Sequence, residues 1–152
     1  MYLRQVIFDS FFIGVLSGFM MGLLLKLCEF LTDIKVYTLL LNVDFIPLIG
    51  RIAWDEPIEF FFHLLMSIVI AFVFIISVNF LRMKAQFVSL WLISFIICLP
   101  AICSFFILAN LTNKDVPQWN DWSAFSYWCL AHVFYMWMLP LLYKKKRSTS
   151  LR

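Results

Sequence analysis

The sequence has few charged residues: Asp, Glu, Lys and Arg make up 14% of its 152 residues, whereas soluble proteins average about 25%. Hydrophobic residues account for 64%, and the mean hydropathy is +0.94. A water-soluble fold of this size cannot hide so much apolar surface, so the composition predicts a protein dissolved in lipid. The basic residues form no stripe interleaved with aromatic residues, which argues against a nucleic-acid partner.

The sequence also lacks the motifs of common catalytic and cofactor sites. It contains no Walker motif, HExxH, GxSxG or acid pair with catalytic spacing, so we do not expect an enzyme. Its cysteines form no C-x-x-C pair and lie in or beside apolar runs, which is typical of buried small side chains rather than of a zinc site or a quinone-linked thiol oxidoreductase. A bis-histidine haem site would need its two histidines at nearly equal depth. We therefore predict no cofactor and no metal.

Four segments contain the roughly 20 mostly apolar residues that a spanning helix needs. They cover about residues 6–30, 58–81, 87–111 and 123–143. The sequence therefore predicts an all-α membrane protein, with one four-helix transmembrane domain over residues 1–152 and a basic cytoplasmic tail over residues 144–152. The short link at residues 82–86 predicts that the second and third spans form an antiparallel hairpin. The first span is too long for a signal peptide and has no cleavage site after it, so we expect it to be retained.

Lysine and arginine in short loops favour the cytoplasm, so their distribution predicts the orientation. With the N-terminus inside, the cytoplasmic side carries Arg4, Arg82, Lys84, Lys144, Lys145, Lys146, Arg147 and Arg152. The outer loops carry only Lys35, Arg51 and Lys114. Both termini are therefore predicted to be cytoplasmic, in an inner, or plasma, membrane. Residues 144–147 are expected to anchor the topology near anionic lipid headgroups.

The first outer loop, residues 31–57, has an apolar centre that polar and helix-breaking residues interrupt. The interruptions are Asn42, Asp44, Pro47, Gly50 and Arg51. A fifth span there would place these groups in lipid. We therefore expect residues 36–54 to form an interfacial or re-entrant segment.

Small residues recur every four positions along the first span, at Ser10, Gly14, Gly18 and Gly22. Such a stripe lets another helix approach closely. It indicates helix packing, either within the chain or between chains, and a lining for substrate or ion passage is the alternative.

Ionisable residues gather toward the predicted outer half of the membrane. They are Lys26, Glu29, Glu59, His63 and His132. Charged groups at such depths are costly and usually face the bundle interior or water, and histidine titrates near neutral pH. The set is our candidate for a proton-responsive or polar-ligand site. In the alternative interpretation, the glutamates lie at headgroup level, Lys26 extends outward and each histidine is a hydrogen-bonded packing residue.

The layout resembles the YagU-like family of bacterial inner-membrane proteins. The resemblance rests on the segment GVLSGFMMGLLLKLCE, the histidine-led helix HLLMSIVIAF, a Trp-containing outer loop and the last helix AHVFYMWMLPLLYKKK. It implies a contribution to acid tolerance and carries over no catalytic residue. The matching positions are Glu29, His63 and His132.

The sequence thus favours a non-enzymatic membrane protein linked to acid or envelope stress, in which His63 and His132 respond to protons with Glu29 and Glu59 as partners. One alternative is an accessory or immunity-type subunit that docks a partner helix through its glycine stripe. Another is a small oligomeric transporter or channel. The expected partners are the lipid bilayer and either a second copy or another membrane protein.

Overall fold

The computed structural model describes residues 2–44, 46–81, 87–112 and 114–150, and every regular element in these ranges is helical. The long helices are α1 (Tyr2–Thr32), α3 (Glu56–Phe80), α4 (Phe87–Leu111) and α5 (Trp122–Ser150). Two short elements lie between α1 and α3, namely α2 (Val36–Leu40) and a 3₁₀ turn at Ile49–Arg51. All four long helices are long and apolar enough to cross a membrane, which confirms the predicted all-α fold with four apolar helices.

The ends of the helices differ from the predicted spans mainly at the C-terminus. The last span was expected to end at residue 143, but α5 continues to Ser150. Residues 144–147 therefore belong to the same helix as the last predicted span. The predicted link at residues 82–86, with its basic residues, and Arg152 lie outside the described residues.

Local signals account for where the long helices begin and end. At the start of α5, the carboxylate of Asp121 accepts a hydrogen bond from the Ala124 N–H at 3.0 Å, which is an N-cap contact. Pro57 lies in the first turn of α3, where its missing N–H has no intrahelical partner to lose. Beyond α1, Asp33 adopts a φ of 58°, the left-handed conformation that commonly ends a helix.

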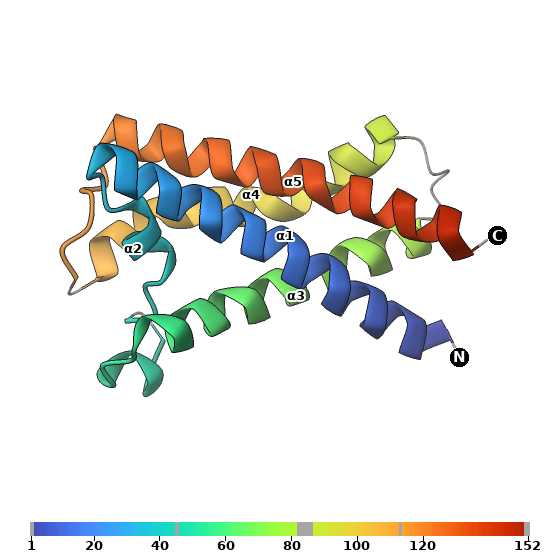
Figure 1. The fold of residues 1–152 in the computed structure, drawn as a ribbon, viewed down its shortest axis with the longest axis horizontal. Coiled ribbons are helices and arrows are strands. Elements are labelled where there is room, and N and C mark those ends of the chain that lie inside the picture. Colours follow the sequence, from blue (N-terminus) through green and yellow to red (C-terminus); the bar gives the residue numbers. More distant parts are fainter. Residues whose placement is uncertain (1, 45, 82–86, 113, 151–152) are drawn as a thin grey trace.

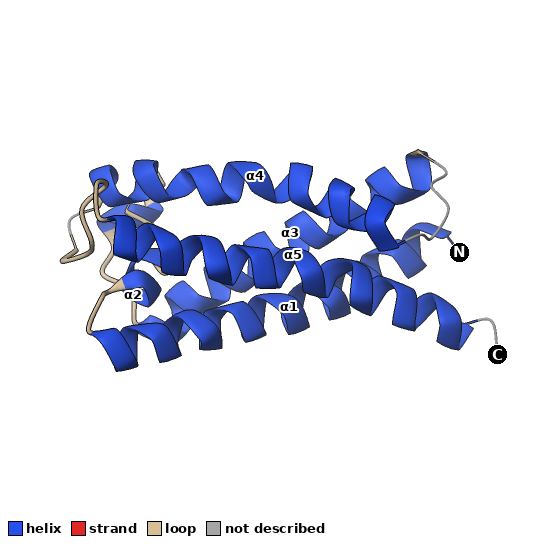
Figure 2. Ribbon diagram, turned by 90° about the horizontal axis from the view of Figure 1, so that it is seen from above, coloured by secondary structure: helices blue, strands red, loops and turns tan. Residues whose placement is uncertain are grey.

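The four long helices form a bundle in which each one packs against two neighbours, in the order α1, α3, α4, α5 and back to α1. Figure 1 shows that the N- and C-termini lie at one end of the bundle, whereas α2 lies at the other. Figure 2 shows the same bundle from a perpendicular direction, with α2 again at the end opposite the termini. We call these the terminal end and the loop end.

The segment predicted to be interfacial or re-entrant is folded against the loop end. Val36 and Leu39 of α2 are fully buried, and α2 packs against α1, α4 and α5. Asn42, which is also buried, donates a side-chain hydrogen bond to the carbonyl oxygen of Leu108 in α4 at 3.2 Å. Its polar group is therefore satisfied by the bundle itself. Whether the segment lies in the interface or re-enters the bilayer stays a prediction.

A contact between α4 and α5 compensates for a proline. Pro140 has no N–H, so the carbonyl oxygen of Met136, four residues earlier, loses its helical donor. The hydroxyl of Ser94 in α4 donates to that oxygen at 2.8 Å. Ser94 and Met136 are both fully buried, so this hydrogen bond replaces the missing one where water cannot.

We expect Ser94→Ala to lower the free energy of unfolding by about 1–3 kcal/mol, because it leaves a buried carbonyl unpaired. Titration with sodium dodecyl sulfate in mixed micelles measures this quantity. In a Pro140→Ala background the N–H at position 140 restores the helical donor, so Ser94→Ala should cost much less there. Equal costs in both backgrounds would contradict this role for Ser94.

Candidate functional site

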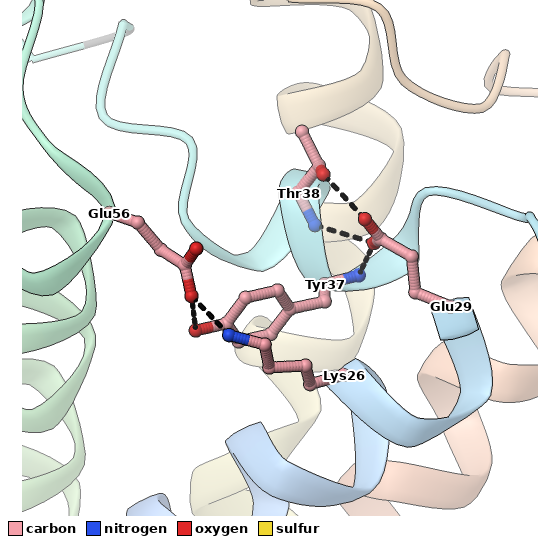
Figure 3. Close-up of polar contacts among 5 residues, drawn as sticks. All are labelled: Lys26, Glu29, Tyr37, Thr38 and Glu56. Atoms are coloured by element: carbon pink, nitrogen blue, oxygen red, sulfur yellow. Dashed lines mark hydrogen bonds and ion pairs between the residues drawn. The ribbon is translucent and has the colours of Figure 1, made fainter.

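Polar side chains of α1, α2 and α3 meet around a cavity of about 370 Å³ at the loop end. Three of the five residues predicted as the ionisable cluster line it: Lys26, Glu29 and Glu59. The remaining lining residues are Phe30, Tyr37, Thr38, Leu41 and Glu56. Figure 3 shows five of these residues, contributed by all three helices.

The carboxylate of Glu29 holds the beginning of α2. Its Oε2 atom accepts hydrogen bonds from the N–H groups of Tyr37 at 2.7 Å and Thr38 at 2.9 Å. Its Oε1 atom accepts a third from the Thr38 hydroxyl at 2.8 Å, and Figure 3 shows these contacts converging on the one carboxylate. These N–H groups have no partner within a helix as short as α2, so a distant carboxylate caps it from outside.

Lys26 pairs with Glu56, the first residue of α3, and not with Glu29, which lies three residues away on its own helix. The Lys26 Nζ atom lies 2.5 Å from Oε1 of Glu56 and 5.1 Å from the centre of the Tyr37 ring. Both side chains of the pair are half exposed, so the ion pair itself contributes about 0–1 kcal/mol. Its main consequence is positional, because it brings α1, α2 and α3 together at one point.

Tyr37 completes this junction by donating its hydroxyl hydrogen bond to Oε1 of Glu56 at 3.1 Å. Burial, and then the hydrogen bond to the Glu56 carboxylate, raise the pKa of the Tyr37 phenol above its ordinary value. The phenol therefore stays protonated and remains a donor across the physiological pH range. Neither Glu56 nor Tyr37 was predicted as a site residue, because nothing in the local sequence relates them to Lys26.

The loop between α4 and α5 is fastened to the loop end by further charged contacts. Lys114 forms an ion pair with the buried carboxylate of Glu59. Lys35 pairs with Asp115, and this hydrogen bond raises the pKa of the exposed Lys35 ammonium. The hydroxyl of Thr112 lies 3.1 Å from Oδ2 of Asp44. Together, these contacts join the two loops that close this end of the bundle.

The two histidines lie apart from the carboxylates that were predicted to be their partners. Nε2 of His63 is 3.2 Å from the carbonyl oxygen of Gly18, and Nδ1 of His132 is 2.8 Å from that of Trp128. A neutral histidine can donate either hydrogen bond. The predicted pairing of the histidines with Glu29 and Glu59 is therefore wrong in this structure: those carboxylates bind α2 and Lys114, and neither histidine lines the cavity.

The stripe of small residues on α1 faces α3. A Cβ atom added at Gly14 would lie 2.5 Å from the backbone Cα of Ile68, and one at Gly18 would lie 2.5 Å from the Ser67 hydroxyl oxygen. Gly22 approaches the ring of Phe60 in the same way. Ser10 is buried, and its hydroxyl donates to the carbonyl of Val6 in its own helix. A partner helix could use the glycine face only by displacing α3.

Basic residues of the predicted headgroup cluster differ in their surroundings. Lys146 pairs with Asp9 of α1 at 2.6 Å and lies over the ring of Phe8. Arg147 donates to the Tyr143 hydroxyl at 3.1 Å, whereas Lys144 and Lys145 are exposed. Lys146 therefore joins the first helix to the last instead of pointing freely toward lipid headgroups.

Within the described ranges, no three His, Cys, Asp or Glu side chains are grouped so that they could hold a metal ion. The fold is a bundle of four helices that are each long and apolar enough to span a membrane, and its loop end is closed by hydrogen-bonded and ion-paired carboxylates. Comparisons with protein-family models, curated proteins and solved structures found no match. The resemblance to the YagU-like family stays a prediction from the sequence.

Proposed function

We propose that this chain is a non-enzymatic protein of a bacterial inner membrane, with both termini in the cytoplasm, that responds to acid at its loop end. The observation that carries the proposal is the triple hydrogen bond by which the Glu29 carboxylate holds α2. The resemblance to a family linked to acid tolerance points the same way. The proton-responsive groups differ from those first predicted, because carboxylates take the place of the two histidines.

The distribution of charge supports the orientation. Of the nine acidic residues, all except Asp9 belong to the loop end, and Asp9 is paired with Lys146. The described part of the terminal end carries Arg4 and the four basic residues at 144–147. An excess of lysine and arginine favours the cytoplasmic side, which supports an orientation with the carboxylate-rich loop end outside, where acid arrives first.

The hydrogen bonds of Glu29 are of a kind that protonation of the carboxylate weakens. Hydrogen bonds from N–H and O–H groups to an ionised carboxylate are stronger than those to a neutral carboxyl group. The carboxylate therefore stabilises α2 while it is ionised, and binding of a proton to it weakens all three contacts. The neutral carboxyl group also carries a proton of its own, which cannot face the N–H donors of α2.

Other ionisable groups lie around Glu29. They line the cavity or pair with groups beside it, and they come from α1, α2, α3 and both loops: Lys26, Lys35, Tyr37, Glu56, Glu59, Lys114 and Asp115. In acid, the carboxylates among them lose their charge while the lysines keep theirs. Repulsion between the remaining lysines then adds to the loss of the Glu29 contacts and favours release of α2.

A spin label at Leu40, on α2, tests the proposal in a variant whose native cysteines have been replaced. We expect the label to be immobile at about pH 7 and to gain a mobile component as the pH falls to about 3. Glu29→Gln should show the mobile component at neutral pH, because an amide has one acceptor oxygen and a donor NH₂ that faces the α2 N–H groups. Electron paramagnetic resonance line shapes measure the mobile fraction.

Asp33→Asn is the matched control, because it removes a carboxylate four residues away on the same connection. Asn tolerates the left-handed φ of 58° at this position. The control should leave the label immobile at neutral pH and preserve its response to acid. A label that stays immobile at every pH, or equal behaviour of the two variants, would refute the proposal.

A further inference from the structure

A second, more open hollow lies at the opposite end of the molecule, on the outer face of α1. It has a volume of about 560 Å³ and is lined by Arg4, Gln5, Ile7, Phe8 and Phe11. Phe8 and Phe11 are 64% and 56% exposed, and Ile7 is 53% exposed. We call these five residues the α1 groove.

The polarity of the α1 groove changes along the helix axis. Arg4, Phe8 and Phe11 follow a spacing of four and then three residues, so they share one face of α1. At a rise of 1.5 Å per residue, about 10 Å of helix separates Arg4 from Phe11. The groove is therefore cationic and polar toward the end of the bundle and aromatic toward its middle.

The charge around the groove is positive. Among the described residues at this end, Asp9 is the one acidic residue, and its carboxylate lies against Lys146 at 2.6 Å. The Lys146 ammonium lies 4.4 Å from the centre of the Phe8 ring, but Asp9 balances its charge, so the positive charge of the groove is that of Arg4. This environment suits an anionic group and disfavours a cationic one.

We infer that the α1 groove binds one anionic phospholipid, with its phosphate on Arg4 and an acyl chain along Ile7, Phe8 and Phe11. A phospholipid has the same order of polarity, because its charged phosphate lies at the membrane surface and its hydrocarbon lies deeper. Arginine presents a planar fork of donors that matches phosphate oxygens. The inference depends on the helices spanning a bilayer and is independent of the acid response at the loop end.

Spin-labelled lipids test this inference in vesicles of phosphatidylcholine that contain the full chain. The association constant of labelled phosphatidylglycerol, relative to labelled phosphatidylcholine, should exceed one for the natural sequence. Arg4→Gln should lower this ratio by about fivefold, the effect of one basic residue close to an anionic headgroup. Arg4→Lys should retain part of the preference, because it keeps the charge but loses the fork.

Lys144→Gln provides the matched control, since it removes one exposed positive charge from the same end without touching the α1 groove. It should change the ratio much less than Arg4→Gln does. Equal losses in the two variants would mean that diffuse surface charge attracts the lipid, which would overturn the inference. A ratio of one for the natural sequence would overturn it as well.

Discussion

Replacing Gly14 with alanine is expected to destabilise the bundle more than the same change at Gly18 or Gly22. The new Cβ atom would lie 2.5 Å from the Cα and 2.9 Å from the N of Ile68. These are backbone atoms, so the clash is relieved only if α1 and α3 move apart. Overpacking of this kind costs about 1–3 kcal/mol, and occasionally more, which exceeds the ~1 kcal/mol that alanine gains over glycine in a helix.

The other two glycines provide a graded comparison within one helix. At Gly22 the obstacle is the far edge of the Phe60 ring, which can rotate or shift, so Gly22→Ala should be close to neutral. At Gly18 the obstacle is Ser67, whose hydroxyl donates to the Gly14 carbonyl at 2.7 Å and lies 2.9 Å from the Tyr135 hydroxyl. Gly18→Ala should therefore have an intermediate cost.

Denaturation in mixed micelles measures this series as differences in the free energy of unfolding. The expected order of loss is Gly14, then Gly18, then Gly22. An equal loss of unfolding free energy at all three positions would show that the glycines are needed for a reason other than the close approach of α3. A larger loss at Gly22 than at Gly14 would contradict the packing of α1 against α3 described above.

Replacing Lys114 with methionine is the second change with a large expected effect. The Glu59 side chain is only 8% exposed, so removal of Lys114 leaves a buried carboxylate without its counter-ion. Breaking a buried ion pair from one side typically costs about 3–5 kcal/mol. Since Lys114 itself is 29% exposed, water can partly replace it, and we expect a loss of about 2–4 kcal/mol.

A double variant separates the value of the ion pair from the cost of an unpaired charge. Lys114→Met combined with Glu59→Leu removes both charges and should recover most of the lost stability, because an apolar pair has no desolvation penalty to offset. Lys35→Met is the matched control, because its partner Asp115 is 88% exposed and water can solvate that carboxylate. We expect little change from this control. A single Lys114→Met variant as stable as the natural sequence would contradict the structural role of the pair.

Part of the candidate site could be predicted from the sequence, because the number of residues from the end of a span gives the depth of a side chain in the bundle. Lys26, Glu29 and Glu59 were predicted to approach each other near the outer ends of their spans, and they line one cavity. Counting residues gives the height of a side chain in the bundle but not the direction in which it points. The histidines have suitable heights, yet their ring nitrogens face backbone carbonyls.

The hydrogen-bond and ion-pair partners could not be predicted for a related reason. Lys26 and Glu56 are 30 residues apart in sequence, and Lys114 and Glu59 are 55 apart. The local rule for helices relates only residues three or four apart, such as Lys26 and Glu29. In the folded chain Glu29 is already engaged by the N–H groups of α2, a helix too short to be predicted from periodicity.

The sequence by itself determined the number of long apolar helices and the sign of the charge at each end of the bundle. These properties depend on composition within windows of about 20 residues, and each window is read without knowledge of the others. The tertiary structure alone decided that the glycine stripe packs against α3, that Lys146 joins α5 to α1, and that Glu29 caps α2. Those contacts depend on how each helix is rotated about its axis, which is settled only when all the apolar faces pack together.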